Sequence, residues 1–163
     1  MAAGSTYTPL ATQTLSSAAA TVTFSSISGA YTDLVLIFGG TGNGVDIQYQ
    51  FNGDTGTNYS VTRLSGNGTT AVSNRNTNYA SIEADYNAYA NATQTVNICN
   101  IMNYSNSTTY KTALFRSNNA SLGVDAGVGL WRNTAAITQV LIKTNASTFS
   151  TGTVFSLYGI AAA

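Results

Sequence analysis

The chain has 163 residues, of which 44% are apolar, enough for one domain with one sizeable core. Only 7% of the residues are charged, the net charge is zero and histidine is absent, so Ser-His-Asp and Cys-His catalysis and most transition-metal sites are excluded. The chain also lacks the basic surplus with which proteins bind nucleic acid or anionic membranes, and we expect neither as a partner.

Small polar residues take the place of charged residues on the surface. Threonine, serine and asparagine number 25, 17 and 17, and together supply 59 of the 163 residues. Protein interfaces are depleted in Lys, Glu and Asp and enriched in Tyr, of which this chain has 10. We therefore expect much of the surface to be interface, with symmetric self-association as the usual outcome.

The chain begins with residues 1–14, which contain the single proline, Pro9, and no clean alternation of apolar and polar residues. We expect an extended N-terminal arm here that reaches a neighbouring molecule, followed by a single domain over residues 15–163. The first residues lack the basic and apolar regions of a secretory signal, and the longest strongly apolar run, residues 34–38, is too short to cross a bilayer. We therefore expect synthesis in a host cytoplasm without a signal peptide.

Two-residue periodicity dominates the rest of the chain. In residues 45–51 every odd position is apolar and every even position is polar, as in a strand with one face on a core. Residues 52–56, Asn-Gly-Asp-Thr-Gly, are typical of a turn, and alternation resumes in residues 58–64. The pattern predicts a β-hairpin.

Eight further short segments have the composition of strands and are bounded by Gly, Asn or Ser: residues 20–24, 33–38, 81–85, 95–102, 110–117, 126–131, 137–144 and 154–160. No long window keeps a helical apolar stripe, and only residues 84–92 and 134–137 leave room for a single helical turn. The sequence therefore predicts an all-β fold, an antiparallel β-sandwich with jelly-roll-like topology and about 8–10 strands.

Glu83 and Asp85 form the candidate catalytic pair, because two carboxyl groups can hydrolyse a glycosidic bond without histidine. On a strand they share a face, and one of them would have to be desolvated enough to hold a proton. Tyr86 and Tyr89 are the nearby aromatic residues. We favour the alternative that both carboxylates are solvated charges at a sheet edge, and we assign no catalytic residue.

Asp54 lies in the turn at residues 52–56, which faintly resembles a calcium-binding loop. A calcium site needs several oxygen donors, usually with more than one carboxylate, and Asp54 is the only carboxylate in the turn. Asp46 is too far back on the preceding strand to be included. We favour a tight turn without an ion, and we assign no metal or cofactor ligand.

Trp131 is the only tryptophan, and the sequence leaves two interpretations of it open. In an alternating strand it fills the core of the sandwich. If exposed, it would join the tyrosines and asparagines as a platform on which a sugar ring stacks.

Cys99 is the only cysteine, so it has no partner for an intrachain disulfide, and its strand-like surroundings indicate a small buried residue. Arg63, Arg75, Arg116 and Arg132 are well separated in the sequence. We interpret them as isolated surface or interface charges.

Six segments carry a resemblance to a known family: residues 21–27 (TVTFSSI), 31–36 (YTDLVL), 51–59 (FNGDTGTNY), 110–112 (YKT), 129–132 (GLWR) and 155–160 (FSLYGI). They resemble the small virion proteins of tailed bacteriophages over most of the chain. Related segments occur both as free-standing proteins and as domains of longer fibres. The resemblance implies a β-sandwich virion component without catalytic activity.

Within that family the chain looks most similar to a capsid decoration (cement) protein, because it carries no fibre shaft, coiled coil or adhesin repeat. Such a protein would form a homotrimer, bind the major capsid protein and lie on the virion head surface. The alternative is a receptor-binding module of a tail or head fibre that recognises host surface glycans. A polysaccharide-cleaving enzyme that uses Glu83 and Asp85 is not expected.

Overall fold

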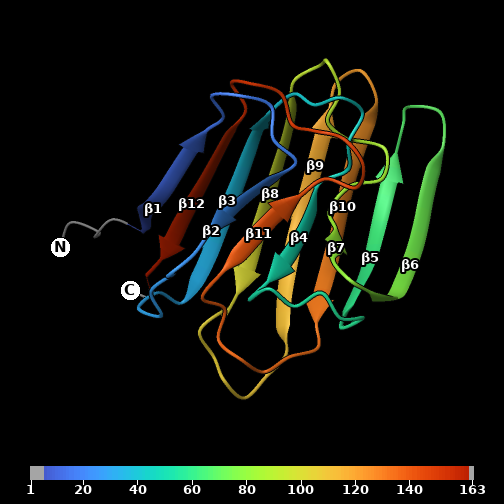
Figure 1. Cartoon of the computed structure of the whole chain (residues 1–163). Helices are drawn as coiled ribbons and strands as arrows, with labels where there is room; N and C mark the ends of the chain where they lie inside the picture. The colour runs from blue at the N-terminus through green and yellow to red at the C-terminus, as the bar shows by residue number, and fades with distance from the viewer. Residues whose placement is uncertain (1–5, 162–163) are drawn as a thin grey trace.

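The computed structural model describes residues 6–161, which form two antiparallel sheets packed face to face with no helix (Figure 1). The large sheet has eight strands in the order β1-β12-β3-β8-β9-β10-β5-β6, and the small sheet has four in the order β2-β11-β4-β7. The strands of the large sheet are, in chain order, β1 (Tyr7–Thr14), β3 (Asp33–Gly40), β5 (Tyr59–Gly66), β6 (Ala71–Tyr79), β8 (Thr95–Met102), β9 (Lys111–Asn119), β10 (Gly123–Trp131) and β12 (Val154–Ile160). Those of the small sheet are β2 (Thr21–Phe24), β4 (Gln48–Phe51), β7 (Ile82–Glu83) and β11 (Val140–Lys143).

The hydrophobic core lies between the two sheets. Along β12, Phe155 is buried inside the sandwich, whereas its neighbours Ser156 and Val154 point to the opposite face of the large sheet and are half-buried. The Phe155 ring centroid lies 5.2 Å from those of both Phe38 and Phe149. Burial of each large apolar side chain contributes about 1.5–3 kcal/mol, so this layer is the main source of stability.

Each of the ten predicted strands overlaps a strand of the structure, and the predicted antiparallel β-sandwich is confirmed. The strand order is compatible with the jelly-roll-like arrangement that we expect. The prediction misses β1 and β6. The β6 sequence, AVSNRNTNY, is polar almost throughout because β6 is the last strand of the large sheet and pairs only with β5.

The segment expected to be an N-terminal arm is in part a strand. Residues 7–14 form β1, which pairs antiparallel with β12 and has a register shift between Pro9 and Ala11. Leu10 and Ala11 pack against the core, so β1 belongs to the sandwich. Pro9 lacks a backbone N–H, which an edge strand tolerates. Residues 1–5 of the expected arm lie outside the described residues.

The predicted hairpin between residues 45–51 and 58–64 is wrong. β4 lies in the small sheet and β5 in the large sheet, so the intervening turn carries the chain across the sandwich. The turn itself is confirmed, with φ angles of 52° at Asn52 and 69° at Gly53. Asn52 Oδ1 accepts a hydrogen bond of 2.9 Å from the Thr138 amide, so a distant segment holds the turn between the sheets.

Candidate functional site

A polar pocket lies beside the edge of the small sheet, where the inner face of the large sheet is no longer covered by it. β7 is the edge strand of the small sheet, and the large sheet extends past it with β5 and β6 (Figure 1). The pocket has a volume of about 480 Å³. Its lining residues are Asp46, Arg63, Asn74, Asn76, Tyr79, Glu83, Asp85 and Tyr86.

The structure brings Glu83 and Asp85 into this pocket, but in different environments. Asp85 is 2% exposed; its Oδ2 accepts a hydrogen bond of 3.0 Å from the Ile47 amide, and its Oδ1 has no partner. Burial, aided by the nearby Asp46 carboxylate, raises the pKa of Asp85 well above its usual value. The interpretation of both carboxylates as solvated edge charges is therefore wrong for Asp85.

Arg63 is the charged centre of the pocket, so its interpretation as an isolated surface charge is also wrong. The residue is 4% exposed, and its Nη1 lies 3.3 Å from Glu83 Oε2 and 3.2 Å from the Glu83 carbonyl oxygen. The Tyr86 ring centroid lies 5.1 Å from the guanidinium carbon. The sequence contained a signal for this burial. Residues two apart on a strand share a face, so Arg63 lies on the same inward face as Tyr59 and Val61.

This geometry does not favour glycoside hydrolysis. Asp85, whose pKa is raised by burial, is only 2% exposed, so its carboxyl group is not placed to protonate a glycosidic oxygen directly. Glu83 is neutralised by Arg63. Tyr86 lies at the pocket with 49% of its surface exposed, whereas Tyr89 is not among the lining residues. The arrangement is better suited to binding a ligand than to cleaving one.

Asp125 of β10 anchors the loop that carries Tyr86. Its carboxylate is 2% exposed and accepts hydrogen bonds from three consecutive amides, those of Tyr86 (2.9 Å), Asn87 (3.0 Å) and Ala88 (2.8 Å). Bonds from amides to a carboxylate are stronger than neutral ones, so the loop is held firmly. Sequence analysis missed Asp125 because its partners are nearly forty residues away in the chain.

Trp131 belongs to the core, which confirms the first of its two interpretations. It is 1% exposed, stacks on Tyr59 with ring centroids 6.3 Å apart, and meets Phe51 edge-on at 5.7 Å. Its Nε1 donates a hydrogen bond of 2.7 Å to Asp54 Oδ2. Trp131 therefore offers no platform for a sugar.

Asp54 is a turn residue whose carboxylate oxygens are both hydrogen-bonded. In addition to Trp131, the Gly56 amide donates to Oδ1 at 2.9 Å and Asn58 Nδ2 donates to both oxygens. Desolvation works to raise the pKa of Asp54, but these bonds outweigh it and the pKa is lowered. Asp46 lines the polar pocket instead, and no group of three His, Cys, Asp or Glu residues within residues 6–161 is placed to hold a metal ion.

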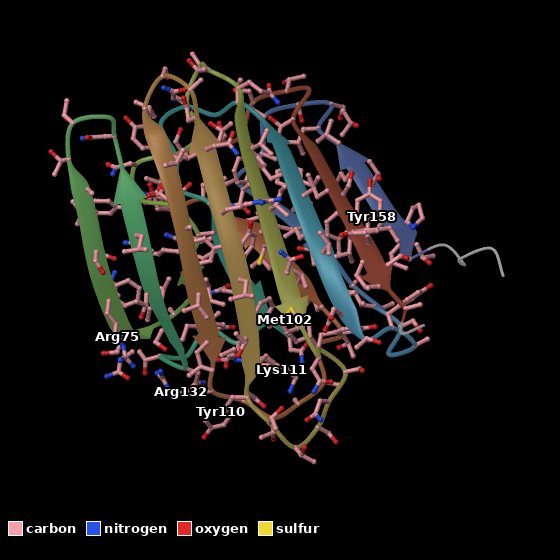
Figure 2. The ribbon with its side chains drawn as sticks, turned by 180° about the vertical axis from the view of Figure 1, so that it is seen from behind. Arg75, Met102, Tyr110, Lys111, Arg132 and Tyr158 are labelled. Atoms are coloured by element: carbon pink, nitrogen blue, oxygen red, sulfur yellow. The ribbon has the colours of Figure 1, made fainter. Side chains whose placement is uncertain are left out.

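Cys99 and the other arginines occupy ordinary positions. Cys99 is fully buried in β8, as predicted, and burial raises the pKa of its thiol to about 12. Arg132 donates hydrogen bonds to the Thr57 carbonyl (2.7 Å) and to Asn78 Oδ1 (3.1 Å) at one end of the sheet (Figure 2). Arg75 and Arg116 are exposed on β6 and β9, as expected of surface charges.

The second candidate site is the outer face of the large sheet, meaning the face turned away from the small sheet. Figure 2 views the molecule from this side and shows that, among residues 6–161, no other element covers this face. The register of the strands aligns the outward side chains in rows across the sheet. One row, from β3 to β5, consists of Ile37, Ile98, Arg116, Ala126 and Leu64. The next consists of Val35, Asn100, Leu114, Val128 and Thr62.

This outer face exposes aliphatic side chains that the fold does not cover. Eight large apolar residues are exposed among residues 6–161, and five of them lie here: Leu64 (65%), Met102 (39%), Leu114 (45%), Val124 (59%) and Val128 (38%). A hollow of about 690 Å³ lies over β5, β6, β9 and β10. On the outward positions of the large sheet the charged residues are Asp33, at the start of β3, Arg116 in the middle, and Arg75 on the edge strand β6. Contiguous apolar surface of this kind marks interaction sites.

The fold defines the chain as a two-layer antiparallel β-sandwich with two candidate sites, the polar pocket and the outer face. No family model matches the sequence, and a search of the curated proteins finds no match. The part of the chain that the structure describes contains no helix long and apolar enough to span a membrane.

Proposed function

We propose that the chain is a structural subunit that assembles with copies of itself through the outer face, and that it serves as a capsid decoration (cement) protein on the head of a tailed bacteriophage. The observation that carries the proposal is the exposed aliphatic surface of this face, with Leu64, Val124 and Leu114 each at least 45% exposed. The cores of protein interfaces are apolar and depleted in Lys, Glu and Asp. The outer face has this composition.

Charge complementarity favours a second copy of the chain as the occupant. A strongly acidic or basic partner would need opposite charges to bind, and the middle of the outer face offers only Arg116. Another copy presents the same nearly uncharged, aliphatic surface. Closed cyclic symmetry lets each copy bury part of its face, and a homotrimer, as the family resemblance implies, is one such arrangement.

A decoration protein stabilises a shell by mass action. It binds the assembled shell of major capsid protein and not the dissociated subunits, so each bound copy lowers the free energy of the assembled state. An oligomer that contacts several capsid subunits at once gains further affinity through multivalency. The location on a phage head rests on the resemblance carried by segments such as residues 51–59 and 155–160.

The copy number and position of the protein in purified virions test this proposal. Quantitative gel densitometry gives the number of copies, and a cryo-EM map gives their position. Hundreds of copies spread over the icosahedral lattice would support the decoration role. A handful of copies at the tail or at one vertex would reject it and favour the receptor-binding module.

A further inference from the structure

Buried polar atoms without a hydrogen-bond partner gather at the polar pocket. Four such side-chain atoms occur in residues 6–161, and three belong to residues that line this pocket: Arg63 Nε, Asn74 Oδ1 and Asp85 Oδ1. Arg63 and Asp85 are only 4% and 2% exposed. Since buried polar groups in folded proteins are nearly always hydrogen-bonded, this concentration points to a molecule that supplies the missing partners.

A hydroxyl-rich molecule matches these three atoms. Arg63 Nε is a donor and needs an acceptor, whereas Asn74 Oδ1 needs a donor. A hydroxyl group both donates and accepts, so it serves Asp85 Oδ1 whether or not that carboxyl group carries a proton. Because the three atoms are covered, the ligand would reach them directly after a small side-chain movement or through a bridging water.

The charges of the polar pocket narrow the ligand further. Three carboxyl groups, those of Asp46, Glu83 and Asp85, line the pocket together with one guanidinium group, that of Arg63, which is paired with Glu83. This excess of carboxyl groups disfavours phosphates and acidic sugars. A metal ion is disfavoured because it cannot accept the Arg63 Nε–H bond and would lie beside the positive guanidinium.

An exposed aromatic ring completes the site. Tyr86 is 49% exposed and lies against the Arg63 guanidinium at 5.1 Å. Asp125 fixes the Tyr86 backbone by accepting its amide hydrogen bond at 2.9 Å. An aromatic ring beside carboxylate and amide groups stacks on the apolar face of a sugar while those groups bond its hydroxyls.

From these observations we propose that the polar pocket is a carbohydrate-binding site for a neutral or amino sugar residue. Its volume of about 480 Å³ is within the range of small-ligand pockets. It lies on the inner side of the large sheet, whereas self-association uses the outer face, so the inference does not depend on the proposed assembly. On a particle with many copies, a weak site of this kind gains strength through multivalency.

Saccharide binding by the purified full chain tests the proposal. An array of immobilised neutral, N-acetylated, amino and acidic monosaccharides and disaccharides identifies the probe, and saturation-transfer NMR measures its affinity. We expect binding of neutral or amino sugars and not of acidic ones. Tyr86→Ala removes the stacking ring and should weaken binding about fivefold to tenfold.

Tyr110→Ala is the matched control, because Tyr110 is 55% exposed, lies between β8 and β9 (Figure 2) and is not among the residues that line the polar pocket. It should leave the affinity unchanged. If circular dichroism shows that Tyr86→Ala does not fold, Asn76→Ala, which removes an amide from the pocket lining, replaces it and should also weaken binding.

Three results would overturn the proposal. The first is that the protein binds no neutral or amino sugar, and the second is that the pocket variant and the Tyr110→Ala control bind with equal affinity. The third is that a crystal structure in saturating sugar shows only ordered water beside Arg63 Nε, Asn74 Oδ1 and Asp85 Oδ1. The oligomeric state of the same preparations reports on the assembly proposal separately, so one proposal can fail without the other.

Discussion

Replacement of Trp131 by alanine measures how much the aromatic cluster under the turn contributes to stability. The indole is 1% exposed and packs on Tyr59 and Phe51, with ring centroids 6.3 and 5.7 Å away. Truncation of a buried tryptophan costs about 3–5 kcal/mol through lost burial and the cavity left behind. The broken bond from Nε1 to Asp54, at 2.7 Å, places the expected loss at the upper end, about 4–5 kcal/mol.

Trp131→Phe keeps an aromatic ring, although a smaller one, and removes the Nε1–H donor. We expect a loss of about 2–4 kcal/mol, smaller than that of Trp131→Ala, from the lost hydrogen bond to a charged group and the small cavity left by the shorter ring. The assay is urea denaturation followed by far-UV circular dichroism, since the variants lack the only tryptophan. A loss below about 1 kcal/mol in Trp131→Ala would refute the core assignment.

The pH dependence of unfolding gives a second readout of the same bond. The folded pKa of Asp54 lies below its ordinary value of 3.8, so ionised Asp54 adds stability above that pH. This stability is lost as the pH falls through the folded pKa. Trp131→Phe removes one cause of the lowering, so the acid-induced loss of stability attributable to Asp54 should be smaller in the variant.

Three further predictions follow from contacts of the described residues. Asp125→Ala leaves three loop amides without their acceptor and should lower the free energy of unfolding by about 3 kcal/mol, with faster hydrogen exchange at residues 86–88; unchanged exchange would contradict the anchoring role. Gly129→Ala places a Cβ 2.6 Å from Ile82 and should cost about 1–3 kcal/mol in thermal or urea unfolding, whereas a neutral effect would mean that Ile82 can move aside. Deletion of residues 1–14 removes β1 and exposes the edge of β12, so it should cause aggregation detectable by light scattering; a stable, monodisperse product would support a free arm instead.

Local alternation in the sequence was sufficient to locate most strands but not to assign them to sheets. Residues 48–51 and 59–64 alternate alike, yet β4 and β5 lie in different sheets, because pairing depends on contacts with β11 and β10 far along the chain. β6 lacked an apolar signal since it extends past the small sheet and buries little. Its partner β5 could be predicted from alternation because β5 has an inward face to bury.

The sequence identified residues of the candidate sites but not their burial or their hydrogen-bond and ion-pair partners. Glu83 and Asp85 were recognised as neighbours, whereas the burial of Asp85 and the pairing of Glu83 depend on Ile47 and Arg63, which belong to other segments. The outward parity of Leu114 could be read from its strand. The sequence does not show that the outer face stays uncovered. This follows from the structure, in which the four strands of the small sheet all pack on the opposite face of the large sheet.

The oligomeric state of the purified chain tests the central claim most directly. Sedimentation equilibrium should find a discrete oligomer, a trimer if the family resemblance holds. Leu114→Glu places an unpaired charge in the middle of the outer face and should weaken association at least about 100-fold, with little effect on folding because the position is 45% exposed. Ala146→Glu, which adds the same charge in an exposed loop, should leave the oligomer intact. A monomeric wild-type chain, or an oligomer that Leu114→Glu does not weaken, would contradict the assignment of the outer face as the assembly surface.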